Sequence, residues 1–202
     1  MEQNKKIMQL NEFELIESIQ SGNLSVCVIG IGRIGLPTAL SFANSGLSTV
    51  GVDVNSKLVE TINSKIFPLK DEPGYDVIFD KVIHENFSAS TKIEDIVPIS
   101  DIIILSLPTP MDENNIPDYS ALLSVGKQLG ELLTKDSVVI IESTVEPGFI
   151  ENELITCIEN SEKKLVAGKD FAIGVCPETA NPGQIMNDFE TLPRLVGAID
   201  NH

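Results

Sequence analysis

The feature that most constrains this chain is Gly30-Ile31-Gly32-Arg33-Ile34-Gly35, which has the pattern G-x-G-x-x-G. A short apolar run at residues 24–29 leads into it, and a run rich in small residues follows at 36–45. The first run predicts a buried strand and the second a helix that ends at Gly46. Glycines at this spacing between a strand and a helix are typical of a turn that binds a dinucleotide.

Each glycine of the turn has its own expected task. Gly30 permits the tight turn, Gly32 lets the backbone approach a pyrophosphate, and Gly35 lets the helix pack closely on the strand. The helix N-terminus would then offer unpaired N–H groups and the positive end of its dipole to the phosphates. The alternative is that the glycines serve only to make tight turns.

Asp53 follows the next predicted strand, residues 48–52, and lies 18 residues after Gly35. A carboxylate at this place accepts hydrogen bonds from both ribose hydroxyls of NAD and repels the 2′-phosphate of NADP. Lys57 is close enough to pair with such a phosphate, but we favour NAD. The alternative role for Asp53 is to cap the helix predicted over residues 55–65.

The rest of the chain alternates apolar strands with amphipathic helices. The clearest strand is DIIILSL at residues 101–107, which is followed by a polar, proline-containing loop at 108–118. This alternation predicts an α/β fold: a Rossmann-like, doubly wound parallel sheet with helices on both faces. Further strands are expected at 137–141, 171–175 and 194–197, and helices at 11–20, 75–83, 119–133 and 149–158, whereas 66–91 is otherwise irregular.

Composition narrows the functional classes. The chain has 14 basic and 30 acidic residues, a formal charge of −16, which disfavours binding to nucleic acid or to an anionic membrane. No apolar run has transmembrane length. The cysteines Cys27, Cys157 and Cys176 lie far apart without CxxC spacing, which predicts reduced thiols in the cytoplasm and no disulfide framework or metal site.

Several blocks along the chain resemble the UDP-glucose/GDP-mannose dehydrogenase family, the nucleotide-sugar 6-dehydrogenases. The form P-E-x-x-x-P-G is most similar to the branch that oxidises UDP-N-acetylhexosamines such as UDP-N-acetylmannosamine. Thr179 departs from that branch, which commonly has arginine there, and Arg33 stands where an aromatic residue is frequent. The blocks run in the family's order from about residue 25 to 198: VCVIGIGRIGLPTALSFANSG, VGVDVN, DEPG, LSLPTPMDENNIPD, VVIIESTVEPG, CPETANPG and LPRLVGA.

The resemblance implies roles for residues that follow predicted strands. Thr144 would lie beside the reacting sugar carbon, Glu178 would transfer protons during thioester hydrolysis, and Ser143 and Thr109 would contact the cofactor. A loop carboxylate beside an apolar pocket suits general-base work. The expected cofactor-binding residues are Gly30, Ile31, Gly32, Arg33, Ile34, Gly35, Asp53, Asn55, Lys57, Pro108, Thr109, Pro110, Ser143 and Thr144.

Simpler interpretations of these residues stay open at this stage. Ser143 or Thr144 could cap the next helix. Thr109 could be the solvated tip of a stiff turn, and Glu178 could be an ordinary surface glutamate.

The expected organisation is a helical extension at residues 1–23 and a cofactor-binding domain at 24–202. We expect the helix at 11–20 to pack on a sheet edge. The family also has a central helix, through which it typically dimerises, and a second domain that supplies a cysteine nucleophile and the UDP-binding surface. No residue here can be assigned those roles, so this chain should bind NAD but not oxidise a UDP-sugar alone.

Two alternatives to this function remain. One is a non-catalytic NAD-binding module, or a remnant that acts with a separate subunit. The other is a β-hydroxyacid or 6-phosphogluconate-type dehydrogenase, although those enzymes lack the STVEPG and PETANPG blocks.

Overall fold

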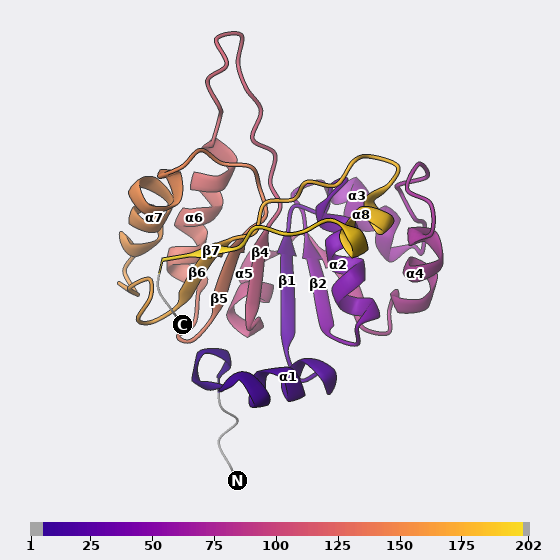
Figure 1. The fold of residues 1–202 in the computed structure, drawn as a ribbon, viewed down its shortest axis with the longest axis horizontal. Coiled ribbons are helices and arrows are strands. Elements are labelled where there is room, and N and C mark those ends of the chain that lie inside the picture. The colour runs from indigo at the N-terminus through magenta and orange to yellow at the C-terminus, as the bar shows by residue number, and fades with distance from the viewer. Residues whose placement is uncertain (1–5, 200–202) are drawn as a thin grey trace.

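The fold is a seven-stranded sheet covered by helices on both faces (Figure 1). The computed structural model describes residues 6–199; residues 1–5 and 200–202, the outer ends of the expected extension and domain, lie outside the described residues. The strand order is β3-β2-β1-β4-β5-β6-β7, and only β7 runs antiparallel to its neighbour. This architecture confirms the predicted Rossmann-like α/β fold. The strands are β1 (Ser25–Ile29), β2 (Ser48–Val52), β3 (Phe87–Ser90), β4 (Ile102–Leu105), β5 (Val138–Ile141), β6 (Ala172–Val175) and β7 (Gly197–Ala198).

The central strand β1 is apolar throughout because both of its faces are buried. Val26 and Val28 point into one hydrophobic core, whereas Cys27 and Ile29 point into the other. Strands in parallel sheets that are covered on both faces have this continuous apolar sequence. Burial also raises the pKa of the Cys27 thiol to about 12, so this thiol stays protonated.

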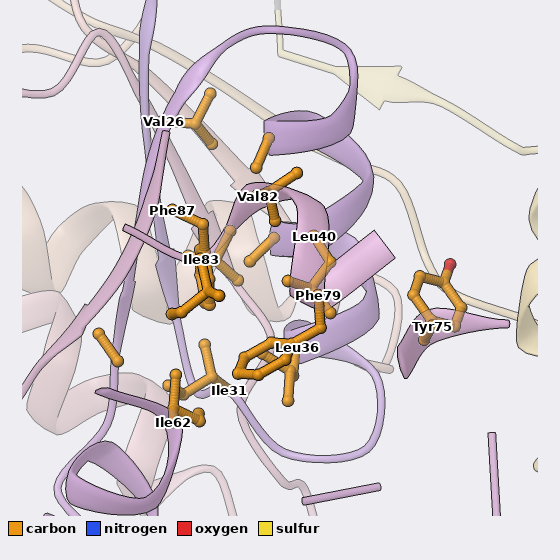
Figure 2. Close-up of a cluster of buried hydrophobic side chains, with 14 of the residues drawn as sticks. Val26, Ile31, Leu36, Leu40, Ile62, Tyr75, Phe79, Val82, Ile83 and Phe87 are labelled. Atoms are coloured by element: carbon orange, nitrogen blue, oxygen red, sulfur yellow. The ribbon is translucent and has the colours of Figure 1, made fainter. Parts of the chain in front are cut away.

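The first core joins residues of β1 and β3 to helices that include α2 and α4 (Figure 2). Phe79 is fully buried there, and the Tyr75 hydroxyl lies 3.1 Å from the Ser41 hydroxyl. Ile185 and Phe189 join this core from a helix near the end of the described chain. The helices on this side are α2 (Gly35–Asn44), α3 (Ser56–Asn63), α4 (Tyr75–Val82) and α8 (Ile185–Thr191).

The second core lies under the helices of the other face. Leu122 and Leu129 from the longest of them pack with Ile103 and Leu105 of β4. No helix within residues 6–199 is both long and apolar enough to cross a bilayer. These elements are α5 (Ile93–Ile96), the 3-10 helix η2 (Val97–Ile99), α6 (Ser120–Leu132), the π-helical turn η3 (Ile150–Leu154) and α7 (Ile155–Glu159).

The structure corrects some of the expected elements. Strand β3 lies in the stretch expected to be irregular; its sequence, FSAS, carries two serines because alternate residues of this edge strand are only half-buried. Helices α5 and α8 are also additional. The last strand, expected at 194–197, is only the two-residue β7, and Arg194 lies before it, where its side chain reaches buried carboxylates.

The N-terminal helix α1 (Glu12–Gln20) confirms the predicted helix but not its expected place on a sheet edge. It crosses beneath the amino ends of the strands, at the foot of the view (Figure 1). Asn11 and Glu14 form its capping box, and Leu15 packs against the first core. Gln9, in the 3-10 turn η1 (Ile7–Gln9), donates a 2.9 Å hydrogen bond to Asp136. The helix lies here because its apolar side chains, such as Leu15, pack against the first core.

Replacing Phe79 by alanine tests the first core. Because Phe79 is fully buried, Phe79→Ala should lower the free energy of unfolding by about 3–5 kcal/mol. Val77 lies on the same helix but is 70% exposed, so Val77→Ala should change the free energy of unfolding by less than about 0.5 kcal/mol. Urea denaturation followed by circular dichroism measures both, and equal effects would contradict the packing described here.

Candidate functional site

A cleft of about 870 Å³ opens at the carboxyl ends of the parallel strands. Ligands of open α/β sheets bind at this edge, where the strand order reverses on either side of β1. The residues that line the cleft include Gly30, Gly32, Arg33, Ile34, Asp53, Asn55, Pro108, Thr109, Ser143, Thr144 and Glu178, all of them expected at the site.

The glycine turn leaves the N-terminus of α2 open toward this cleft. Gly30 has φ +90°, and a Cβ on it would lie 2.5 Å from the Ser106 carbonyl oxygen. A Cβ on Gly35 would lie 1.9 Å from the Gly30 carbonyl oxygen, so only glycine fits this contact. A Cβ on Gly32 would meet no described heavy atom within 4 Å, which leaves its backbone open to a ligand.

Asp53 connects the glycine turn to the start of α3. Its carboxylate accepts hydrogen bonds from the Ile31 N–H at 3.1 Å and from the Asn55 N–H at 2.9 Å. The side chain that caps α3 is that of Asn55, which accepts from the Leu58 N–H. Asp53 therefore does not have the capping role considered above, and it lines the cleft beside the glycine turn.

The proline-flanked Thr109 is tied to the neighbouring strand end. Its hydroxyl donates a 2.9 Å hydrogen bond to the Thr144 carbonyl oxygen, so it is not simply a solvated tip. Beyond Pro110 the chain protrudes from the molecule as a narrow loop that is closed by a bridge between Met111 and Pro117 (Figure 1). The loop therefore stands above the cleft and contributes only its base to the cleft wall.

Ser143 fixes the end of β5 against the end of β4. Its hydroxyl lies 2.8 Å from the Leu107 carbonyl oxygen and accepts from the Leu107 N–H at 2.9 Å. The helical segment that follows begins at Ile150 after Phe149, which makes no side-chain cap. Neither Ser143 nor Thr144 therefore caps that segment, and both face the cleft.

The side chain of Glu178 is buried, so Glu178 is not an ordinary surface glutamate. Its side chain is 6% exposed and forms an ion pair with the Arg194 guanidinium. Its other carboxylate oxygen accepts from the backbone N–H groups of Thr179 and Ala180, at 2.7 and 2.6 Å. These contacts hold the carboxylate at the cleft wall. The Arg194 guanidinium itself lies over the Phe189 ring, 4.8 Å from its centroid.

Glu142 is a second buried carboxyl, and the sequence interpretation gave it no role. It accepts a 2.9 Å hydrogen bond from the Thr38 hydroxyl and lies 3.9 Å from Arg194. Burial raises the pKa of Glu142, and the nearby Glu178 adds to the rise, while Ser106, Thr38 and Arg194 oppose it. Glu142 and Ser106 both line the cleft. The sequence does place this glutamate directly after a strand, which is a signal for a residue at the site. The residues that it contacts, however, lie far away in the sequence.

Arg33 lies at the cleft but is already paired. Its guanidinium contacts Asp71 at 2.6 Å and the buried Glu72 at 3.3 Å. Glu72 also accepts a 2.8 Å hydrogen bond from the Gly183 N–H. The DEPG block thereby joins the glycine turn to the loop that carries Glu178.

Four expected residues lie outside the lining of the cleft. Ile31 and Gly35 are buried in the packing of the glycine turn, whereas Lys57 and Pro110 lie beyond its walls. The three cysteines are free thiols; Cys176 is half-buried, with its sulfur 4.0 Å from Arg194. Within residues 6–199 no cluster of histidine, cysteine and acidic side chains is placed to hold a metal ion.

Known proteins resemble this chain over most of its length. Protein CapL of Staphylococcus aureus is 34% identical over 174 residues, covering 86% of this chain and 39% of that protein. The UDP-N-acetyl-D-mannosamine dehydrogenase of Campylobacter jejuni is 31% identical over 180 residues, covering 86% and 43% respectively. The solved ternary complex of GDP-mannose dehydrogenase from Pseudomonas aeruginosa superposes with a TM-score of 0.81 at 27% identity, covering 87% of this chain and 41% of that one.

This chain thus spans about two fifths of the length of these relatives. The family profile described as "UDP-glucose/GDP-mannose dehydrogenase family, NAD binding domain" matches residues 24–202. The chain belongs to the UDP-glucose/GDP-mannose dehydrogenase family and carries its NAD-binding domain.

Proposed function

We propose that this chain supplies the cofactor-binding part of an enzyme that oxidises C6 of a UDP-N-acetylhexosamine to the acid, using two NAD. The observation that carries the proposal is one continuous cleft with an open glycine turn and Asp53 at one end and Thr144 and Glu178 at the other. Relatives named UDP-N-acetyl-D-mannosamine dehydrogenase support the choice of sugar. The cytoplasmic location and the family's dimer remain predictions.

The residues at the glycine turn fit a dinucleotide. The unobstructed Gly32 backbone and the mouth of α2 would hold the pyrophosphate, because unpaired N–H groups and the helix dipole favour an anion there. Asp53 would accept hydrogen bonds from the adenosine ribose hydroxyls. Arg33 would add positive charge at the phosphates, and Thr109 and Ser143 would lie along the other ribose.

NAD, when bound, accepts the hydride that leaves the sugar carbon. Thr144, after the end of β5, would lie beside the reacting sugar carbon and help to position water. Glu178 would take up a proton, and Arg194 would keep its carboxylate in place. Because none of the described residues that line the cleft is a cysteine, the thiolate that such a two-step oxidation uses would have to come from outside this site.

The absence of a cysteine from the described cleft wall also favours a second candidate, a non-catalytic NAD-binding module or a subunit that acts with a partner. The two candidates share the cofactor site and differ in turnover. Under both, the 202-residue chain alone binds NAD.

Filling the open side of Gly32 tests the pyrophosphate site. Gly32→Val should weaken NAD binding by about tenfold or more, because the side chain enters the cleft where the backbone would meet the phosphates. The melting temperature should stay within about 2 °C of wild type. Gly35→Ala is the matched comparison and should destabilise the fold, because its Cβ meets the Gly30 carbonyl oxygen. A Gly32→Val protein that binds NAD normally by calorimetry would rule out this placement.

Neutralising Asp53 tests cofactor choice. Asp53→Asn should weaken NAD binding by about tenfold and narrow the preference for NAD over NADP, because one charged acceptor and one repulsive charge are lost. Asp76→Asn removes the same charge from an exposed position on α4 and should change neither affinity. An unchanged ratio of NAD to NADP affinity in the Asp53 variant would disprove the role assigned to it.

Incubation with substrate separates cofactor binding from catalysis. The purified chain with NAD and UDP-N-acetylmannosamine should produce no NADH absorbance at 340 nm above a blank without sugar, because the sugar is not held in line with the cofactor. Calorimetry should show NAD binding without UDP-sugar binding. Steady NADH production by this chain alone would overturn the expected division of labour.

A further inference from the structure

The two halves of the cleft differ in the charge that they present to a ligand. If the pyrophosphate lies at the glycine turn and the adenosine at Asp53, the other nucleoside of a dinucleotide extends over the ends of β4, β5 and β6. The described side chains with a charge that line this second half are Glu142 and Glu178, and both are carboxyls. Their common cation, Arg194, lies behind them and does not line the cleft.

Arg194 can balance only one of these two carboxylates, and its contacts favour Glu178. Glu178 has Arg194 on one oxygen and two backbone N–H donors on the other. Glu142 is 3.9 Å from the guanidinium, and its Oε1 is also the acceptor for Thr38. Arg194 therefore balances the charge of Glu178, and a charge on Glu142 would be left mainly without a counter-ion.

The remaining oxygen of Glu142 is unusual in its surroundings. Its Oε2 is buried and has no partner of normal hydrogen-bond geometry among the described residues, although the nearby Ser106 hydroxyl acts to lower the pKa of this carboxyl; the Glu142 side chain is only 5% exposed. A buried carboxylate oxygen without a partner is costly unless a ligand supplies a donor or a positive charge. Glu142 lines the cleft together with Ser106 and Ser143, so a ligand that fills the cleft would lie against this residue.

We propose that Glu142 is a cofactor-contacting residue that recognises the positively charged nicotinamide ring and makes this site prefer oxidised NAD+ over NADH. The nicotinamide ring carries a positive charge in NAD+ and none in NADH, while the pyrophosphate and adenosine are the same in both. A fixed carboxylate in a site shielded from water attracts the first ring and gains nothing from the second. Burial favours the neutral form of Glu142 in the empty site, which is why its pKa is raised, and a positively charged ring in the cleft would favour the carboxylate.

The inference rests on NAD occupying the cleft as proposed above, and it does not depend on any sugar substrate. The test compares the NAD+ and NADH affinities of the 202-residue chain by calorimetry at one pH and ionic strength. Glu142→Gln keeps the shape of the side chain and an oxygen for Thr38, and it removes the charge. We expect the preference for NAD+ over NADH to fall by about tenfold in this variant, which is the effect of about 1.4 kcal/mol.

Glu94→Gln is the matched control. Glu94 is exposed and lines the adenosine half of the same cleft, so its removal changes the net charge equally but should leave the NAD+ to NADH ratio within about twofold. ADP-ribose, which lacks nicotinamide, is the third ligand. Its affinity reports any loss of folding and any change in repulsion of the pyrophosphate, because both affect all three ligands.

The outcomes separate this inference from the function on which it rests. A lower NAD+ to NADH ratio in Glu142→Gln, with ADP-ribose binding retained, supports it. An equal change for NAD+ and NADH, or an equal fall of the ratio in Glu94→Gln, overturns it while the cofactor site stands. If the wild-type chain binds none of the three ligands, the cofactor site itself is wrong and the inference is overturned with it.

Discussion

The contact on which the rest of this structure depends is the close approach of α2 to the ends of β1 and β4. Gly35 lies against the Gly30 carbonyl, and Gly30 lies against the Ser106 carbonyl, at distances that exclude any side chain. This packing buries Leu36 and Leu40 in the first core and turns the start of α2 toward the carboxyl edge of the sheet. A cleft forms at that edge because β2 and β4 lie on opposite sides of β1, so the chain connections diverge there.

A second constraint acts on the far side of the cleft, where two carboxyls are buried within reach of one guanidinium. Burying unpaired charge is expensive, so the positions of Glu178, Glu142 and Arg194 depend on one another. The segment after β6 makes this possible by crossing toward α8 and returning to β7 (Figure 1). Arg194 lies on this returning segment, just before the short antiparallel strand β7.

The sequence predicted the features whose causes are local. The apolar runs of β1, β2, β4, β5 and β6, the glycine turn and the position of the acid after β2 can each be recognised from a few neighbouring residues. Strand β3 was missed because an edge strand with alternating serines lacks an apolar run, and α1 was misplaced because its sequence shows an apolar face but not what covers it. The partnership of Glu142 with Thr38 and Arg194 spans distant parts of the chain, and no spacing rule connects them.

The loop that carries Glu178 is held from several sides, which bears on how the site keeps its geometry. Asp188 of α8 accepts hydrogen bonds from the Asn181 backbone and side chain, and contact with these N–H groups lowers the pKa of Asp188. Glu72 accepts from Gly183 and also pairs with Arg33 at the glycine turn. Glu72 therefore contacts both the glycine turn and the loop that carries Glu178. Because one buried carboxylate contacts both elements, the position of Arg33 at the glycine turn and the position of Gly183 in the loop that carries Glu178 depend on each other.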